Sequence, residues 1–261
     1  MKPLAWAAVL LVAAAPSAAA GQELARRVGE RPNGTVRFSF PVRAGVEICS
    51  RGIRMRGSRT HWREEGRWGA DELCRSGPAE VEVRVADGIV ARVEVLRAGQ
   101  AGSSGTLDLG EVGAAAAADY LIRLARAGAT ERGARDALFP AVLADVPDVW
   151  RDLLSLARDR EVRNAVRTNA LFWLGQEAAD AATEGLAAVA RAEDENQDVR
   201  DAAVFALSQR PADEGVPLLM ELARTAEQAK TRRTAFFWLA QSQDPRVVPF
   251  FEEILLGRGG A

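Results

Sequence analysis

The sequence has few of the residues that carry most enzyme chemistry. Its 261 residues include one histidine, His61, and two cysteines, Cys49 and Cys74. A Ser-His-Asp or Cys-His catalytic arrangement would have to use His61, and no nucleophile-elbow motif is present. Two cysteines and one histidine are also fewer ligands than a zinc site needs. We therefore expect a protein that is not an enzyme and that holds no metal and no cofactor.

A large charge of one sign and long apolar runs are also missing. The formal net charge is −2, so the protein as a whole has no attraction for nucleic acid. Beyond the N-terminus no segment is apolar enough to span a membrane. One region departs from this balance, because residues 26–75 carry twelve arginines against six acidic residues. The rest of the chain is correspondingly acidic.

The first twenty residues have the composition of a secretory signal. A cation at Lys2 precedes an apolar run over 4–15 and three alanines at 18–20, which predicts cleavage near Gly21. The apolar run is shorter than the roughly 20 residues that cross a bilayer, so we expect cleavage and no membrane anchor. The mature protein should then be exported, to the periplasm or the extracellular space.

An even number of cysteines in an exported chain favours a disulfide between Cys49 and Cys74. Closing this loop would stabilise the fold by roughly 3 kcal/mol on the chain-entropy account. Two separate buried thiols are the alternative.

The two halves of the chain follow different periods, which predicts an α+β fold. Apolar and polar residues alternate over 35–109, as in Val36, Phe38 and Phe40, and this pattern is typical of strands. Asp87-Gly88 between two such runs predicts a hairpin turn. We expect a β-rich domain over 21–112, as a sandwich or barrel fragment, and helices over 113–258.

The helical half repeats itself every 32 or 33 residues. Each repeat carries an alanine followed by two apolar residues and, in another row, an arginine that closes a Leu/Val/Ala phrase. The alanines are Ala137, Ala170, Ala203 and Ala235, the second apolar residues are Phe139, Phe172, Phe205 and Phe237, and the arginines are Arg126, Arg158, Arg191 and Arg224. Each unit should hold two helices that stack on the next unit, with Trp173 and Trp238 in the core.

The phrase from Asp198 to Leu207 resembles the D-x-x-V-R-x-x-A-x-x-A-L signature of HEAT repeats, of the short type first noted in phycobilin lyases. The resemblance covers about 114–257. It departs from the pattern in the first unit, where Ala134 replaces the arginine and Pro140 interrupts the aromatic row, so this unit should be kinked. The units begin near Glu131, Val162, Asn196 and Ala229, after one further helix over 114–126. The resemblance implies a right-handed superhelix of helix pairs, whose concave surface commonly binds proteins.

This resemblance favours a non-catalytic scaffold that binds a protein partner. The phycobilin lyases suggest a lyase or isomerase instead, but the export signal opposes that reading because their chemistry is cytoplasmic. A DNA-lesion binder would need a basic groove, which the helical half lacks. Iron-dependent hydroxylases built on this repeat use several His-Glu pairs, and a single histidine excludes them.

Two arginine columns are candidate features of the array. Arg126, Arg158, Arg191 and Arg224 each close a helix, where a cation complements the dipole by roughly 0.3–1 kcal/mol; as a ladder they could also grip acidic groups of a partner. We favour the first interpretation. Arg167, Arg200 and Arg232 stand near helix starts, where the dipole disfavours a cation, so we expect them to bond to acids or carbonyls of the adjacent unit.

Two further motifs have competing interpretations. Residues 51–68 interleave arginine and tryptophan, and their candidate binding residues are Arg56, Arg59, Trp62 and Arg63. They could bind an anionic envelope polymer, or their arginine stems could simply cover the tryptophan rings. Residues 194–198 have the oxygen spacing of a calcium loop, but Val199 replaces its glycine, so we expect a polar turn between units.

Overall fold

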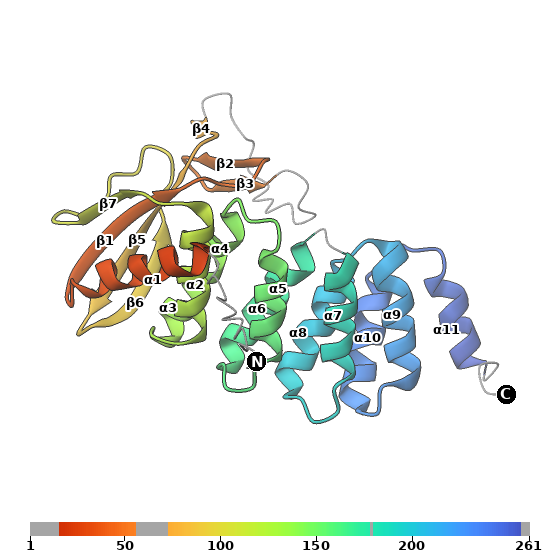
Figure 1. Ribbon diagram of the computed structural model, residues 1–261. Helices are drawn as coiled ribbons and strands as arrows, with labels where there is room; N and C mark the ends of the chain where they lie inside the picture. Colours follow the sequence, from red (N-terminus) through yellow and green to blue (C-terminus); the bar gives the residue numbers. More distant parts are fainter. Residues whose placement is uncertain (1–15, 56–72, 178–179, 257–261) are drawn as a thin grey trace, which may run out of the picture.

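The computed structural model describes residues 16–55, 73–177 and 180–256. Figure 1 shows a β-rich region at one end and a row of helix pairs that extends from it. No strand occurs after Glu111 in the described residues. The change of period near Gly113 therefore marks the change from sheet to helices, and the α+β prediction is confirmed.

The main sheet is four-stranded, in the order β6-β5-β1-β7. Its strands are β1 (Gly34–Phe40), β5 (Ala79–Ala86), β6 (Ile89–Val95) and β7 (Leu107–Glu111). β1 is antiparallel to β5 and parallel to β7. The alternating residues Val36, Phe38 and Phe40 of β1 are fully buried. Asp87 and Gly88 both have positive φ, 52° and 75°, which is the hairpin turn that the sequence predicts.

A second, three-stranded sheet has the order β3-β2-β4. It consists of β2 (Val46–Cys49), β3 (Ile53–Met55) and β4 (Cys74–Arg75). A disulfide joins Cys49 to Cys74, which are also Cα partners in the ladder between β2 and β4. The predicted disulfide is therefore confirmed, and the covalent bond and the strand pairing fix the same two residues.

Helices, and not a second sheet, cover the apolar face of the main sheet, so the expected sandwich or barrel fragment is wrong. The helix α1 (Pro16–Gly29) lies alongside α2 (Ala114–Arg126) across this face (Figure 1). Leu24 and Val28 of α1 are buried, and the Tyr120 ring of α2 meets Phe38 edge-on at 6.0 Å. The sequence reading missed α1 because its first turns overlap the predicted signal.

The helical region contains a broken first unit and three regular ones. In the first unit α3 (Glu131–Asp136) and α4 (Leu138–Leu143) are separate short helices before α5 (Val149–Arg158). The break confirms the predicted kink, although it falls at Ala137, before Pro140. The regular pairs are α6 (Asn164–Gln176) with α7 (Asp180–Arg191), α8 (Gln197–Ser208) with α9 (Ala212–Thr225), and α10 (Ala229–Ala240) with α11 (Val247–Leu255).

Small residues set the distance between neighbouring units. All four repeated alanines, Ala137, Ala170, Ala203 and Ala235, are completely buried. At Gly175 an added Cβ would lie 3.0 Å from the carbonyl oxygen of Ala206 in the next unit. Larger side chains at these positions would force the helices apart. None of the helices in the described ranges combines the length and apolarity that crossing a bilayer requires.

The β-rich region is joined to the first units of the array through backbone as well as side chains. Val42 bridges to Ala144, and Val90 bridges to Ala129. The Arg43 guanidinium pairs with the buried Glu177 carboxylate at 2.9 Å, which ties the chain after β1 to the end of α6. The sheet therefore covers the N-terminal end of the array.

Candidate functional site

Three arginines of the surface column connect neighbouring units. Arg126 pairs with Asp159 and donates to Ser155 at 3.0 Å. Arg191 makes a two-pronged contact with Glu221, at 2.7 and 2.9 Å. Arg224 pairs with Glu253 and lies over the Phe250 ring, 4.8 Å from its centroid. These guanidinium groups are half-exposed, so each pair stabilises the fold by about 1 kcal/mol at most.

Arg158 differs from the other members of this column. It is exposed at the end of α5, and it has no ion pair within the part of the chain that the structure describes. The column of partners stands one residue before each repeated apolar phrase, and its members are Ser155, Ala188, Glu221 and Glu253. In the repeat register the residue that corresponds to Glu221 and Glu253 is Ala188 for Arg158, and alanine has no polar group to accept hydrogen bonds. Of the four surface-column residues in our prediction, only Arg158 is left free to bind a partner.

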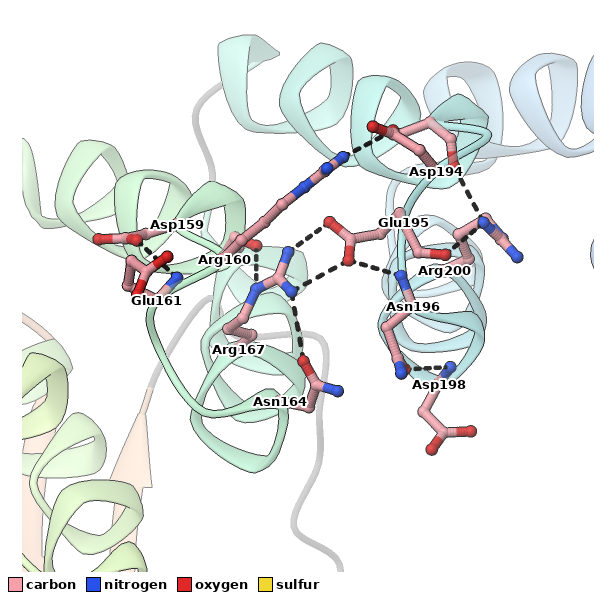
Figure 2. A network of polar contacts seen from close by, with 12 residues as sticks. Asp159, Arg160, Glu161, Asn164, Arg167, Asp194, Glu195, Asn196, Asp198 and Arg200 are labelled. Carbon is pink, nitrogen blue, oxygen red and sulfur yellow. Dashed lines mark hydrogen bonds and ion pairs between the residues drawn. The ribbon is translucent and has the colours of Figure 1, made fainter.

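The second arginine column is built into the interior. Arg167 of α6 is only 2% exposed, and its Nε donates to the Ala157 carbonyl at 2.9 Å. Its Nη1 is 3.0 Å from Glu195, and its Nη2 pairs with the same carboxylate. Figure 2 shows this buried pair between α6 and the loop that precedes α8. A buried guanidinium requires such complete pairing, because an unpaired charge is strongly destabilising.

The other two members of this column, the buried Arg200 and the half-buried Arg232, bond to backbone. Arg200 donates to the carbonyls of Ala192 and Glu193, at 3.1 and 2.9 Å. Arg232 donates to the carbonyls of Ala226 and Glu227, at 2.6 and 2.8 Å. These carbonyls all belong to the end of the preceding unit or to the loop after it. The structure thus gives this column the role that its place near the helix starts predicts.

The acidic phrase at residues 194–198 is a turn whose oxygens are already used. Asp194 pairs with Arg160 at 2.6 Å, Glu195 binds Arg167, and Asn196 caps α8 by accepting from the Asp198 amide at 2.9 Å (Figure 2). Burial opposes the ionisation of Glu195, but the hydrogen bonds from Arg167 and the Asn196 amide hold its pKa below the usual range. In the described residues, no group of three His, Cys, Asp or Glu could hold a metal ion.

Aromatic rings form a continuous row along the first helices of the units. Phe139 stacks on Trp173 at 5.0 Å, and Phe172 stacks on Phe205 at 6.4 Å. Phe205 in turn lies 4.8 Å from Trp238. Trp173 is buried as expected, but Trp238 is only partly so. Phe237 is 56% exposed, which the repeat pattern did not predict, because no further unit in the described chain covers it.

A pocket of about 510 Å³ lies where this row meets the β-rich region. We call it the junction pocket. Strands β3 and β6 line one side, and α3, α4 and α6 line the other. Its lining includes Ile53, Val95, Arg97, Arg135, Phe139 and Trp173. Sequence reasoning missed this site because its residues come from separate elements and share no period; only Phe139 and Trp173 belonged to a recognised row.

The Arg/Trp-rich segment falls largely outside the described residues. Arg56, Arg59, Trp62 and Arg63, together with His61, lie in this part of the chain. Two arginines just before it are described: Arg51 is exposed, and Arg54 pairs with Glu47 at 3.0 Å across the ladder between β2 and β3. Binding of a polymer by this segment therefore stays a prediction.

Comparison with known proteins agrees with the helical geometry. No curated protein matches the chain. Residues 183–258 match the family model for HEAT repeats. The match begins within α7 and extends past the end of α11, and the helices α5 and α6 of the preceding units pack against each other on the side toward the sheet. Residues 183–258 are therefore similar to HEAT repeats, and they form the C-terminal part of a helical array that follows a disulfide-linked β-rich region.

Proposed function

We propose that this protein is a non-catalytic, exported scaffold that binds a protein partner along its helical array. HEAT repeats suggest a scaffold of this kind. The observation that carries the proposal is that Arg158 has no ion-pair partner within the described residues. We call this position the open rung of the arginine column. Its counterparts Arg126, Arg191 and Arg224 are all paired within the array, whereas Arg158 is exposed and the repeat register offers it only Ala188.

The open rung is suited to an acidic side chain of the partner. An arginine presents a planar fork of donors that can bind a carboxylate through two parallel hydrogen bonds. Arg191 shows this geometry with Glu221 inside the array. A glutamate or aspartate of the partner would take the place that Ala188 leaves empty. This contact would then fix where the partner sits along the array.

The test is recovery of crosslinked partners from the envelope fraction of cells that express the full chain. We expect Arg158→Glu to reduce the yield of the specific partner by at least about tenfold, since an interface charge reversal costs more than 1.4 kcal/mol. Arg191→Ala is the matched control, because it removes a paired arginine of the same column. Equal yields from wild type and Arg158→Glu would overturn the role of Arg158, and equal losses from both variants would indicate a general effect on folding.

Export is supported by the disulfide and by the surroundings of Gly21. Cleavage at Gly21 would leave Leu24 and Val28 in the core. The new α-ammonium would lie beside Asp119, because a Cβ built on Gly21 would be 1.9 Å from its Oδ2. Burial raises the pKa of Asp119, against the charge of Arg123, and a nearby ammonium would stabilise the carboxylate. The mass of the protein recovered from the periplasm or the medium tests this: a chain that still carries residues 1–20 would contradict it.

A further inference from the structure

The junction pocket contains an open strand edge. β6 is an edge strand of the main sheet, with β5 as its one neighbour in the described residues. Beyond the end of β6, the Leu96 amide donates to the Glu80 carbonyl of β5 at 2.8 Å, so these residues form a hydrogen-bonded pair. Pairs alternate along an antiparallel ladder. Val95, which is paired with Val81, must therefore direct its N–H and C=O away from β5.

Only the first part of this edge is covered. The Thr130 amide donates to the Val90 carbonyl at 2.9 Å, and the Thr130 hydroxyl donates to the Ala91 carbonyl at 3.1 Å. Further along, burial raises the pKa of the Asp136 carboxylate, and the charge of Arg92 and the Val93 amide, which lies toward this carboxylate, oppose that shift. The Val93 carbonyl and both polar groups of the Val95 backbone have no hydrogen-bond partner among the described residues. These groups face the junction pocket, which Val93 and Val95 line.

The opposite wall of the pocket is apolar. The rings of Phe139 and Trp173 stack at an interplanar angle of 23°, and Pro140 of α4 also lines the pocket. In a strand added to β6, alternate side chains would point to opposite faces. Every second residue of an added strand could therefore pack on this wall. The pocket thus offers backbone groups on one side and a hydrophobic surface on the other, as in grooves that bind peptides by strand addition.

The charge of the pocket selects among such peptides. Arg97 and Arg135 are both exposed and line the pocket. Neither has a carboxylate partner in the described ranges; Arg97 donates only to Gln100, at 3.4 Å. Of the acidic residues in the lining, Asp136 lies 3.5 Å from Arg92, whereas Glu94 accepts from the neutral amide of Gln100 and keeps its charge. Two arginines without a carboxylate partner against one such glutamate leave the pocket with a net positive charge.

We propose that the junction pocket binds an extended, acidic peptide segment of a partner protein, which adds to the main sheet as a strand beside Val93–Val95 of β6. Apolar residues of the segment pack on Phe139 and Trp173, and its carboxylates pair with Arg97 and Arg135. This inference rests on the proposed binding of a protein partner, and adds a second contact that does not include Arg158.

The test uses the full chain and a short fluorescent peptide of alternating Glu and Val, with binding followed by anisotropy. We expect this peptide to bind at least tenfold more tightly than its Lys–Val counterpart, because its carboxylates can form charge-assisted hydrogen bonds with Arg97 and Arg135. Two further peptides are methylated on alternate backbone amides, one on the odd-numbered and one on the even-numbered residues. Only one of these two sets of amides would face β6, so we expect one methylated peptide to lose binding and the other to keep it. Equal binding of the Lys–Val peptide, or full binding of both methylated forms, would overturn the proposal.

Variants of the protein separate backbone from side-chain contributions. Val95→Pro removes the outward N–H without touching the ladder to β5, as proline is tolerated at sheet edges, and should weaken binding at least tenfold. Val95→Ala keeps the N–H and is its matched control. Arg135→Glu should weaken binding, whereas Arg191→Ala, which lies in neither proposed contact, should leave it unchanged. Two results would show that the pocket is a polyanion site and not a strand edge. One is peptide binding that Val95→Pro does not weaken. The other is displacement of the peptide by inorganic polyphosphate to the same extent from wild type and from Val95→Pro. If Arg158→Glu loses the envelope partner but the wild-type protein does not bind the peptide, the proposal for the junction pocket is overturned and the proposed function stands.

Discussion

The two ends of the helical array are finished differently. At the N-terminal end the main sheet and α2 cover the first unit, and Leu138 and Leu143 of α4 are completely buried. At the C-terminal end α11 leaves Val248 64%, Leu255 84% and Leu256 62% exposed. A repeat unit cannot bury its own apolar face, so an array needs a cap at each end. The β-rich region provides one cap, and in the described residues nothing provides the other.

The difference follows from how the units themselves are built. The first unit lacks the buried arginine, since Ala134 stands at that position, and its first helix is broken. In return it has Gly133, where an added Cβ would lie 2.6 Å from the Val90 carbonyl of β6. The unit thus exchanges a contact with other repeats for close packing on a strand. A cap requires a unit modified to receive it.

A substitution in the interior of the array, between the two ends, should cause the largest loss of stability. Glu195→Gln leaves the buried Arg167 guanidinium without its counter-charge, and we expect a loss of about 3–5 kcal/mol in the free energy of unfolding. Asp194→Asn, next in sequence, breaks only a surface pair and should change stability little. Urea unfolding followed by tryptophan fluorescence measures both. Equal midpoints would show that the buried pair does not hold the units together.

The same pair predicts a pH dependence. The pKa of Glu195 is lower in the folded protein than in the unfolded chain, so the unfolded state binds the proton more tightly. The stabilisation from this carboxylate is present above its unfolded pKa, about 4.3, and is lost as the pH falls through the folded pKa. The gap in stability between wild type and Glu195→Gln should therefore narrow below about pH 4. A gap that widens on acidification would contradict this assignment.

Truncating one leucine at each end tests the comparison directly. Leu143→Ala at the capped end removes a fully buried side chain and should cost about 2–5 kcal/mol. Leu255→Ala at the open end removes a side chain that is mostly in water, and the change should stay within about 0.5 kcal/mol. Thermal unfolding of the two variants gives the contrast. A large loss from Leu255→Ala would mean that this end is covered in solution.

Removing the disulfide tests how far the cap depends on its covalent link. The double variant Cys49→Ser, Cys74→Ser should lose roughly 3 kcal/mol, because the unfolded chain regains the freedom of the closed loop. Wild type unfolded under reducing conditions should match this variant. If the two differ, part of the change comes from the serine hydroxyls in the small sheet and not from the link.

The smallest effect is expected at the contact between cap and array. Gly133→Ala pushes a methyl group toward the Val90 carbonyl and should destabilise the protein by about 1–3 kcal/mol. Gly29→Ala at the end of α1 has open space around the new methyl group, so it should be neutral or slightly stabilising. The difference in midpoint between these two variants measures how tightly the sheet is seated on the first unit.

The array could be predicted from the sequence because each unit repeats the same local decisions. Ala170 and Ala203 are 33 residues apart, and so are Arg167 and Arg200 at a different position in the unit. Each unit therefore supports the same interpretation independently. The buried column was assigned correctly because a cation at a helix start conflicts with the dipole and needs another partner. By the same logic, the exception at Ala188 could have been found by aligning the column of residues that precede the repeated apolar phrases.

The β-rich region and the junction pocket could be predicted only in part. Alternation and Asp87-Gly88 identify strands and one turn, but they do not say what covers the sheet. The cover comes from α1 and α2, which lie far from each other in sequence. The junction pocket depends on a strand edge and two unpaired arginines, Arg97 and Arg135, and their proximity arises from tertiary packing alone.

The arginines near the helix starts also bear on how such a chain can change its length. Arg200 and Arg232 each bond to the loop just before their own helix. These contacts therefore lie within one helix pair and the loop that precedes it. Duplicating one hairpin in the gene would copy its fastening together with it. The reach of the scaffold could then grow by one unit at a time while the cap and the existing units stay as they are.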